Sequence, residues 1–217
     1  MTTEYKTEKY VCPCCNKEFE SKIVTSITHE GQDSDFLPRY VGDNPLPFYL
    51  AKCSYCGFVA YPEDYRTEKL KGSVILPSEV KLIYALPLTK KIPVEAQSFF
   101  IAGKIYEKMK KNPYYIGNLY LRGSWCCRLI DNRKGEIEFQ QLAIRFFQIA
   151  LEKSTISNPD AVPVVTYLIA ELYRRLEDRK SAREWFYQTV ESIIDPEQQW
   201  LLDLVQKQAE LNEYLIN

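Results

Sequence analysis

The spacing of hydrophobic residues changes near position 94. Before it, short β-rich segments such as KIVTSIT (22–28) and FYLAK (48–52) are separated by glycine, proline and asparagine, a pattern typical of short strands joined by turns. After it, apolar residues recur at helical intervals, as in VEAQSFFIAGKIYEKMKKN (94–112). The chain is therefore predicted to be α+β and mostly α, with a small β module followed by an antiparallel helical array.

The helical half contains an internal repeat. Two segments share small and aromatic residues at offsets of zero, four and seven, namely Ala143, Phe147 and Ala150, then Ala182, Phe186 and Thr189. These offsets resemble the tetratricopeptide pattern, in which small residues let paired helices approach closely. The two copies are 39 residues apart, whereas the tetratricopeptide period is about 34. The pattern predicts a tetratricopeptide-like array, with a generic helical bundle as the alternative.

Four cysteines form two C-x2-C pairs, Cys12 with Cys15 and Cys53 with Cys56. Zinc prefers four soft ligands in a tetrahedron, and each short turn supplies two of them. Closing the loop between the pairs costs about 3 kcal/mol, whereas structural zinc contributes about 10–16 kcal/mol. The pattern predicts one structural zinc site. Iron fits the same ligands, and free or redox-active thiols are the alternative.

The residue after each pair supports the metal interpretation. Asn16 follows the first pair and Gly57 follows the second. These two residue types best tolerate the left-handed backbone conformation that such turns require. The remaining cysteines and the single histidine are expected to lie outside the site. Cys14 is predicted to be a bystander or a replacement ligand, His29 a surface residue, and Cys126 and Cys127 buried apolar residues.

Three regions follow from these patterns. Residues 1–70 are predicted to form a zinc-ribbon-like module, residues 71–92 a connector interrupted by Pro77 and Pro87, and residues 93–217 the helical domain. The last segment, QQWLLDLVQKQAELNEYLIN (198–217), is predicted to be a helix that caps the array.

Composition places the chain among ordinary globular proteins. Of its 217 residues, 46% are hydrophobic and 26% are charged, with a net charge of −1. The start, MTTEYKTEKY, lacks the apolar core of a signal peptide, and no apolar run approaches the roughly 20 residues of a membrane span. An odd number of cysteines, seven, fits a reducing compartment. We therefore expect a soluble cytoplasmic protein with no membrane partner.

Several motifs together resemble a known family. The chain is similar to the bacterial Domain of Unknown Function 2225 family through the segments CPCCNKEF (12–19), DSDFLPRYVGDNP (33–45), KCSYCGF (52–58), YLIAELYRRL (167–176) and AREWF (182–186). The resemblance implies paired CxxC turns followed by a helical repeat region, and it implies no reaction. Asn16 stands where a glycine is usual in such turns.

Charge is unevenly distributed along the sequence. Residues 66–134 contain 14 basic and 5 acidic residues, whereas residues 1–65 contain 6 basic and 10 acidic residues. An acidic zinc module gains little from neutralising phosphates. A nucleic-acid-associated regulatory role that uses the basic stretch 66–134 is therefore an alternative and not the favoured interpretation.

The favoured hypothesis is an intracellular module that binds a protein or peptide, for which an acidic sequence is one option. By analogy with tetratricopeptide grooves, the partner-binding residues are predicted to be Tyr167, Glu171, Arg174, Arg175, Lys104 and Lys108. Arginine side chains at such a groove can form paired hydrogen bonds with carboxylates. The partner, the process and the oligomeric state are not determined by the sequence.

An enzymatic role has little support in the sequence. The chain has one histidine and no glycine-rich phosphate loop. Asp33, Asp35 and Arg39 are the one cluster with acid–base potential, and turn capping with an ion pair is the preferred interpretation of these residues. We therefore expect no catalytic residues.

Overall fold

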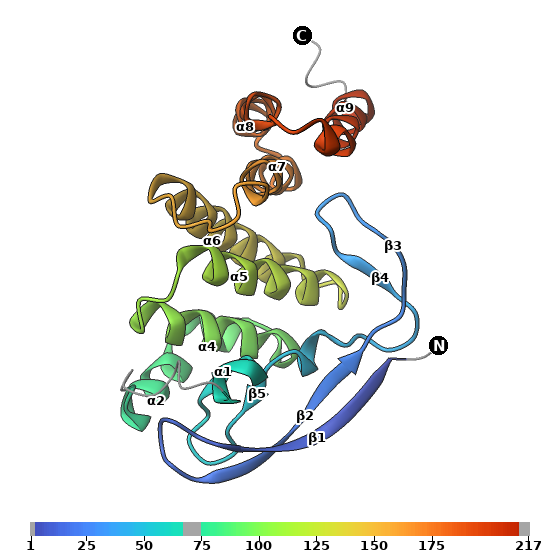
Figure 1. Cartoon of the computed structure of the whole chain (residues 1–217). Coiled ribbons are helices and arrows are strands. Elements are labelled where there is room, and N and C mark those ends of the chain that lie inside the picture. Colours follow the sequence, from blue (N-terminus) through green and yellow to red (C-terminus); the bar gives the residue numbers. More distant parts are fainter. Residues whose placement is uncertain (1–2, 67–74, 213–217) are drawn as a thin grey trace.

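The computed structural model describes residues 3–66 and 75–212 and confirms the α+β, mostly α, class (Figure 1). The strands are β1 (Glu4–Val11), β2 (Glu18–Ser26), β3 (His29–Gln32), β4 (Pro38–Tyr40), β5 (Ala51–Lys52) and β6 (Val59–Ala60). The helices are α1 (Pro62–Arg66), α2 (Pro77–Ala85), α3 (Pro87–Lys91), α4 (Val94–Lys108), α5 (Pro113–Arg128), α6 (Arg133–Glu152), α7 (Ala161–Arg175), α8 (Arg179–Ser192) and α9 (Gln199–Asn212). Two 3-10 turns, η1 (Leu46–Phe48) and η3 (Pro196–Gln198), complete the elements.

The strands form three separate antiparallel pairs, β1 with β2, β3 with β4, and β5 with β6. The first pair keeps one register from Tyr5–Val24 to Val11–Glu18, with a shift between Glu4 and Tyr5, and the third contains only four residues. The strand predicted at 48–52 is therefore shorter than expected. Residues 46–48, just before this strand, form η1 instead, because Pro45 and Pro47 cannot donate hydrogen bonds to a strand ladder.

The helices α4 to α8 pack on one another in chain order (Figure 1). The six repeat residues at the two helix pairs are all buried, as the pattern predicts. Close approach depends on small residues: a Cβ atom at Gly123 of α5 would lie 2.3 Å from the Phe139 ring of α6. The helical array is therefore confirmed, and its likeness to tetratricopeptide repeats stays a prediction.

The predicted connector contains two short helices. Pro77 and Pro87 occupy the first turns of α2 and α3, where the missing N–H of proline costs no helical hydrogen bond. Residues 71–74 of the predicted connector lie outside the described residues. Among the helices in residues 3–66 and 75–212, none combines the length and hydropathy of a transmembrane segment.

One hydrophobic core crosses the predicted boundary at residue 70. Tyr10 and Phe58 of the N-terminal strands belong to the same buried cluster as Phe99 and Phe139 of the helical array. The N-terminal strands and helices α4 to α7 therefore share one core, and a second buried cluster joins α7, α8 and α9. The predicted division into 1–70, 71–92 and 93–217 remains a prediction about folding units.

The hairpin formed by β3 and β4 extends alongside the helical array toward α7 and α9 (Figure 1). At its tip, the Phe36 ring lies 5.5 Å from the Tyr167 ring of α7 and 6.2 Å from the Trp200 ring of α9, measured between ring centroids. Phe36 has a φ of 66°, a conformation that costs a non-glycine residue about 1–3 kcal/mol. The tip is therefore held in place by its tertiary contacts.

Candidate metal centre

Each C-x2-C turn joins the two strands of a hairpin. The backbone N–H of Cys12 donates to the carbonyl of Lys17 (3.0 Å), and that of Cys53 donates to the carbonyl of Phe58 (2.8 Å). Within each turn, the N–H of the fifth residue, Asn16 or Gly57, donates back to the carbonyl of the first cysteine (2.8 and 2.9 Å). The two turns therefore have the same backbone geometry.

The fifth residue of each turn has the predicted left-handed conformation, with φ of 57° at Asn16 and 77° at Gly57. Gly57 is required for a second reason. A Cβ atom at this position would lie 2.8 Å from the Tyr84 ring, whose hydroxyl donates to the Gly57 carbonyl at 3.0 Å. A side chain at this position would displace Tyr84 and so disturb the packing of α2 against the second turn.

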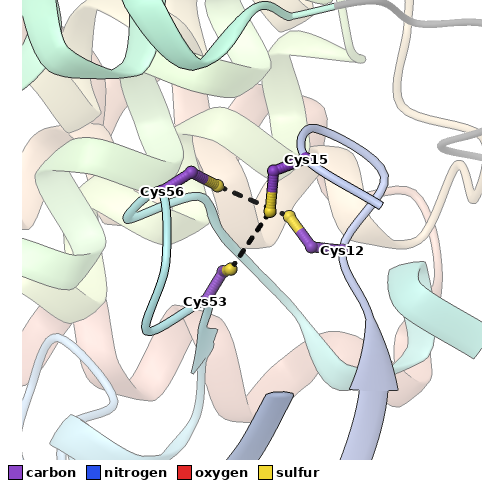
Figure 2. A group of neighbouring side chains, drawn as sticks. All are labelled: Cys12, Cys15, Cys53 and Cys56. Atoms are coloured by element: carbon purple, nitrogen blue, oxygen red, sulfur yellow. Dashed lines mark hydrogen bonds between the residues drawn. The ribbon is translucent and has the colours of Figure 1, made fainter. Parts of the chain in front are cut away.

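The two turns face each other, and their four sulfur atoms converge (Figure 2). The Sγ atoms of Cys12 and Cys56 are 3.5 Å apart, and those of Cys15 and Cys53 are 3.7 Å apart. All four lie within 4.8 Å of one another. A tetrahedral ion with bonds of about 2.3 Å to sulfur requires sulfurs about 3.8 Å apart. The cluster therefore fits a metal ion after small shifts of the thiol groups.

The surroundings of the cluster are largely apolar. Cys12 and Cys53 are buried, and burial raises the pKa of the Cys12 thiol to about 12 and raises that of Cys56 as well. Burial by itself would also raise the pKa of Cys15, but the backbone N–H of Lys17 and the neighbouring thiols hold it below its ordinary value. A bound metal stabilises thiolates, and its positive charge would compensate part of the negative charge of the four buried or half-buried cysteines.

The four cysteines complete a tetrahedral shell by themselves. Four thiolates leave no coordination position for a substrate or water molecule, which distinguishes structural sites from catalytic ones. The geometry therefore supports a metal that links the β1–β2 hairpin to the β5–β6 hairpin. The metal-ligand set Cys12, Cys15, Cys53 and Cys56 that the spacing predicts is the set that the structure brings together.

The other candidate ligands lie outside this cluster. Cys14 is half-buried beside the site, and the exposed His29 contacts its own hairpin through the Gly31 carbonyl at 3.3 Å. Cys126 and Cys127 are fully buried in α5, as predicted. All seven cysteines are free thiols in the described structure.

The predicted partner groove on α7 is covered by the chain itself. Tyr167 and Glu171 have no exposed surface, because the tip of the β3–β4 hairpin lies on them. The Tyr167 hydroxyl donates to the Ser34 carbonyl at 2.9 Å, and the Ser34 hydroxyl donates to Glu171 at 2.6 Å. These two residues therefore do not line an open groove, which corrects that part of the prediction.

The basic residues of the predicted groove are all paired. Arg174 and Arg175 both donate to Glu171, at 2.7 and 2.8 Å. On α4, the Lys104 ammonium lies 2.8 Å from Glu107, and the Lys108 ammonium lies 2.9 Å from Glu79 of α2. The two arginines still reach the surface at an open cavity, whereas the two lysines lie away from it.

The acid–base candidates of the hairpin separate into two environments. Asp33 and Arg39 form a partly exposed ion pair at 3.3 Å, as the sequence predicts, and Asp33 also lies 3.5 Å from Arg128. Asp35 is fully buried and accepts hydrogen bonds from Trp125 (2.9 Å) and from both terminal nitrogens of Arg128 (3.0 and 2.6 Å). Asp35 is therefore a structural anchor between the hairpin and α5, a role that its sequence context does not predict.

No signal in the sequence marks Asp35 as different from its neighbours. It lies 93 positions from Arg128 and 90 from Trp125, and the segment DSDF is typical of any polar turn. The tip of the hairpin, α5 with Arg128 and α7 with Arg175 are brought together by the packing of the whole chain.

Part of the positive charge of the stretch 66–134 is neutralised in three dimensions, among the residues that the structure describes. Several of its cations pair with acidic residues of the N-terminal segment: Arg66 with Glu8, Lys111 with Asp64, and Arg128 with Asp35. The excess of positive charge along this part of the sequence therefore does not correspond to an equally large basic surface.

Comparison with known proteins gives a family and no activity. A model of the family described as "Uncharacterized protein conserved in bacteria (DUF2225)" matches residues 5–212. No curated protein matches the chain, and no solved structure matches it. The match covers both cysteine turns and the helical array, in agreement with the motifs that the two share. The chain therefore belongs to the DUF2225 family.

Proposed function

We propose that the chain is a zinc-stabilised scaffold that binds an acidic segment of a protein partner. Two features support a binding role over catalysis. The four-cysteine cluster forms a closed shell, and four cationic side chains converge on one surface cavity. The second feature carries the proposal, because it supplies a surface whose charge selects a class of partner.

Zinc is the metal that the ligand set favours. Four thiolates in a tetrahedron suit zinc and iron, and zinc in such sites is structural. We expect protein purified without chelator to contain one zinc ion per chain, and the ion should be lost when Cys12 and Cys56 are replaced by serine. Elemental analysis measures the content. A visible absorption band would identify iron instead, and a metal-free protein that folds normally would contradict a structural metal.

The proposed binding cavity has a volume of about 490 Å³ and lies between the β3–β4 hairpin, α7 and α9. Its cations are Arg39 of the hairpin, Arg174 and Arg175 of α7, and Lys207 of α9. Asp33 is its acidic lining residue. Glu171 and Asp35 lie beneath it and are fully buried. Both form ion pairs with the arginines of the cavity.

The charge balance at this cavity favours carboxylates as ligands. Four cations and one carboxylate line it, and the two buried carboxylates beneath leave a positive excess. Arginine and lysine donors at the rim can form charge-assisted hydrogen bonds with glutamate or aspartate side chains. Each such bond contributes about 1.5–3 kcal/mol, and 1.4 kcal/mol corresponds to about a tenfold change in affinity.

An extended nucleic acid fits this region less well than a peptide. Residues 1–65 carry more acidic than basic residues, and several cations of the stretch 66–134 are paired within the chain. A polyphosphate backbone needs many unpaired cations along its path. An acidic peptide needs only a few cations that lie close together.

We expect Arg39→Glu and Lys207→Glu together to weaken binding of an acidic peptide at least about tenfold. Both side chains are exposed, so the substitutions should leave the fold intact. The measurement is fluorescence anisotropy with a labelled peptide of alternating glutamate and serine, titrated with wild type and variant at low and moderate salt.

Lys153→Glu is the matched control, because Lys153 is exposed at the end of α6 and does not line the cavity. It makes the same change of charge per site and should leave peptide affinity nearly unchanged. Equal losses in the control and the double variant, or no binding by wild type, would contradict the proposal. Tighter binding of a single-stranded RNA of equal charge would favour the nucleic-acid alternative.

A further inference from the structure

A second cavity, distinct from the proposed peptide site, is lined by four tyrosines. Its volume is about 520 Å³, and it lies where Tyr61 and α1 meet the end of α4 and the start of α5. Tyr61, Tyr106, Tyr114 and Tyr115 contribute rings to its walls, and Arg122 of α5 contributes a guanidinium group. We refer to it as the tyrosine cavity. Its volume is in the range of small-molecule sites in proteins, about 300–1,000 Å³.

Arg122 differs from the other half-buried arginines of the chain. Arg128 and Arg174 both pair with buried carboxylates, at 2.6 and 2.7 Å. Within residues 3–66 and 75–212, no carboxylate pairs with Arg122. Its Nη1 donates to the Tyr61 hydroxyl at 2.8 Å, and its Nε is buried without an acceptor among the described residues. Its planar group therefore retains hydrogen-bond donors for an anion.

Two carboxylates, Glu63 and Asp64, line the tyrosine cavity, and no ion pair joins either of them to Arg122 in the described structure. The exposed Glu63 lies 3.9 Å from Arg66. Asp64 accepts a short hydrogen bond from the Tyr106 hydroxyl, and the Lys111 ammonium lies 3.9 Å from it. Asp64 is therefore engaged by Tyr106 and Lys111. Because both carboxylates have other partners, the uncompensated Arg122 favours a negatively charged ligand in the cavity.

The walls supply flat apolar surface beside this charge. The Tyr114 and Tyr115 ring centroids are 5.8 Å apart, and those of Tyr61 and Tyr106 are 6.5 Å apart. The Arg122 guanidinium is itself fixed against the Tyr61 ring, 5.9 Å from its centroid. Aromatic rings arranged in this way stack on planar ligands, and the orientation of the arginine is already set before binding.

We propose that the tyrosine cavity binds a small anionic ligand that carries a planar ring. The anionic group pairs with the free donors of Arg122, and the ring lies against the tyrosine walls. A carboxylate and a phosphate both satisfy a guanidinium group in the same bidentate way, so aromatic carboxylates and nucleoside monophosphates share this chemistry. The site is built from side chains of three segments that the fold brings together.

Isothermal titration of the metal-loaded full chain tests the proposal with three probes: 4-hydroxybenzoate, uridine monophosphate and inorganic phosphate. At least one of the two ring-bearing probes should bind with a dissociation constant below the millimolar range, and phosphate should bind at least tenfold more weakly because it has no ring. The probe that binds more tightly identifies which anion the cavity prefers.

Two variants locate the binding. Arg122→Gln should weaken the preferred probe at least tenfold, and Tyr115→Ser should weaken it severalfold. Tyr115 is 57% exposed, so its removal should leave the fold intact. Tyr187→Ser is the matched control, because Tyr187 of α8 is also exposed, at 64%, and lies outside the tyrosine cavity. The Tyr187→Ser protein should bind the preferred probe with the same affinity as wild type.

A spectroscopic measurement separates a direct role of Arg122 from an indirect one. The Arg122 Nε–H resonance in a nitrogen–proton correlation spectrum should shift when the preferred probe is added, and Arg122→Gln identifies that resonance by its loss. The proposal is overturned if neither ring-bearing probe binds wild type at millimolar concentration. It is equally overturned if the two cavity variants bind like wild type, or if the resonance does not move at saturation.

Discussion

Replacing Cys53 by serine is expected to lower the melting temperature of the helices by more than about 10 °C. Cys53 is buried in the four-cysteine cluster, and structural zinc contributes about 10–16 kcal/mol in isolated modules. For a chain of this size, each kcal/mol corresponds to about 2–4 °C. Loss of about a third of the metal's contribution is therefore enough for the predicted shift.

The helices should respond because they share contacts with the metal-bound hairpins. The Tyr65 hydroxyl donates to the Ala51 and Phe58 carbonyls beside the second C-x2-C turn. The Tyr65 side chain packs against the hydrophobic core that contains Phe99 of α4. Tyr84 of α2 donates to the second turn itself. If the N-terminal hairpins lose their structure, the helices lose the packing on one side of this core.

Thermal unfolding followed by helical circular dichroism tests this coupling. Cys14→Ser is the matched control, since Cys14 lies in the same turn but outside the four-sulfur cluster, and its melting curve should overlay that of wild type. A Cys53→Ser protein whose helices melt as in wild type would show that residues 1–70 and the helical array fold independently, as the sequence division suggests.

Asp35→Asn is expected to destabilise the protein by about 3–5 kcal/mol, the usual cost of breaking a buried ion pair. Asp35 has no exposed surface and accepts from Trp125 and Arg128, and Arg175 lies 3.3 Å away. An asparagine side chain has nearly the same shape but places N–H donors against guanidinium donors. The buried arginines would then lack one of their compensating charges.

The free energy of unfolding that Asp35→Asn loses should depend on pH. Burial by itself would raise the pKa of Asp35, but the hydrogen bond from Arg128 and the charges of Arg175 and Arg128 hold it below its ordinary value. Its contribution to stability is therefore fully present above the unfolded pKa of about 3.9 and is lost as the pH falls through the lower folded value. The free-energy difference between wild type and Asp35→Asn should shrink as the pH is lowered below about 4.

Urea unfolding at neutral and acidic pH measures both effects. Asp33→Asn, two residues away, is the control. Asp33 is partly exposed; it pairs with the exposed Arg39 at 3.3 Å and lies 3.5 Å from Arg128, so its replacement should cost much less than that of the fully buried Asp35. Equal costs for the two substitutions would show that the buried network contributes no more than a surface ion pair.

The sequence by itself determined the features that depend on a few neighbouring residues. Two C-x2-C turns with Asn16 and Gly57 define the metal cluster, because a turn of this length fixes both the ligand spacing and the left-handed residue. The helical array was predictable for the same reason. Residues such as Phe147 and Phe186 recur at the spacing that places them on one face of a helix, and both are buried.

Only the tertiary structure decided which charged side chains pair with each other. The sequence places Glu171 and Arg175 on an expected groove, but the tip of a hairpin more than 130 residues away covers Glu171, with Ser34 as its partner. Arg122 and Arg128 are six positions apart in one basic stretch, yet Arg128 pairs with the buried Asp35 whereas Arg122 faces the tyrosine cavity without a carboxylate partner among the described residues. Local sequence signals act over a helical turn or a tight turn, and such pairings arise because a common core brings distant segments together.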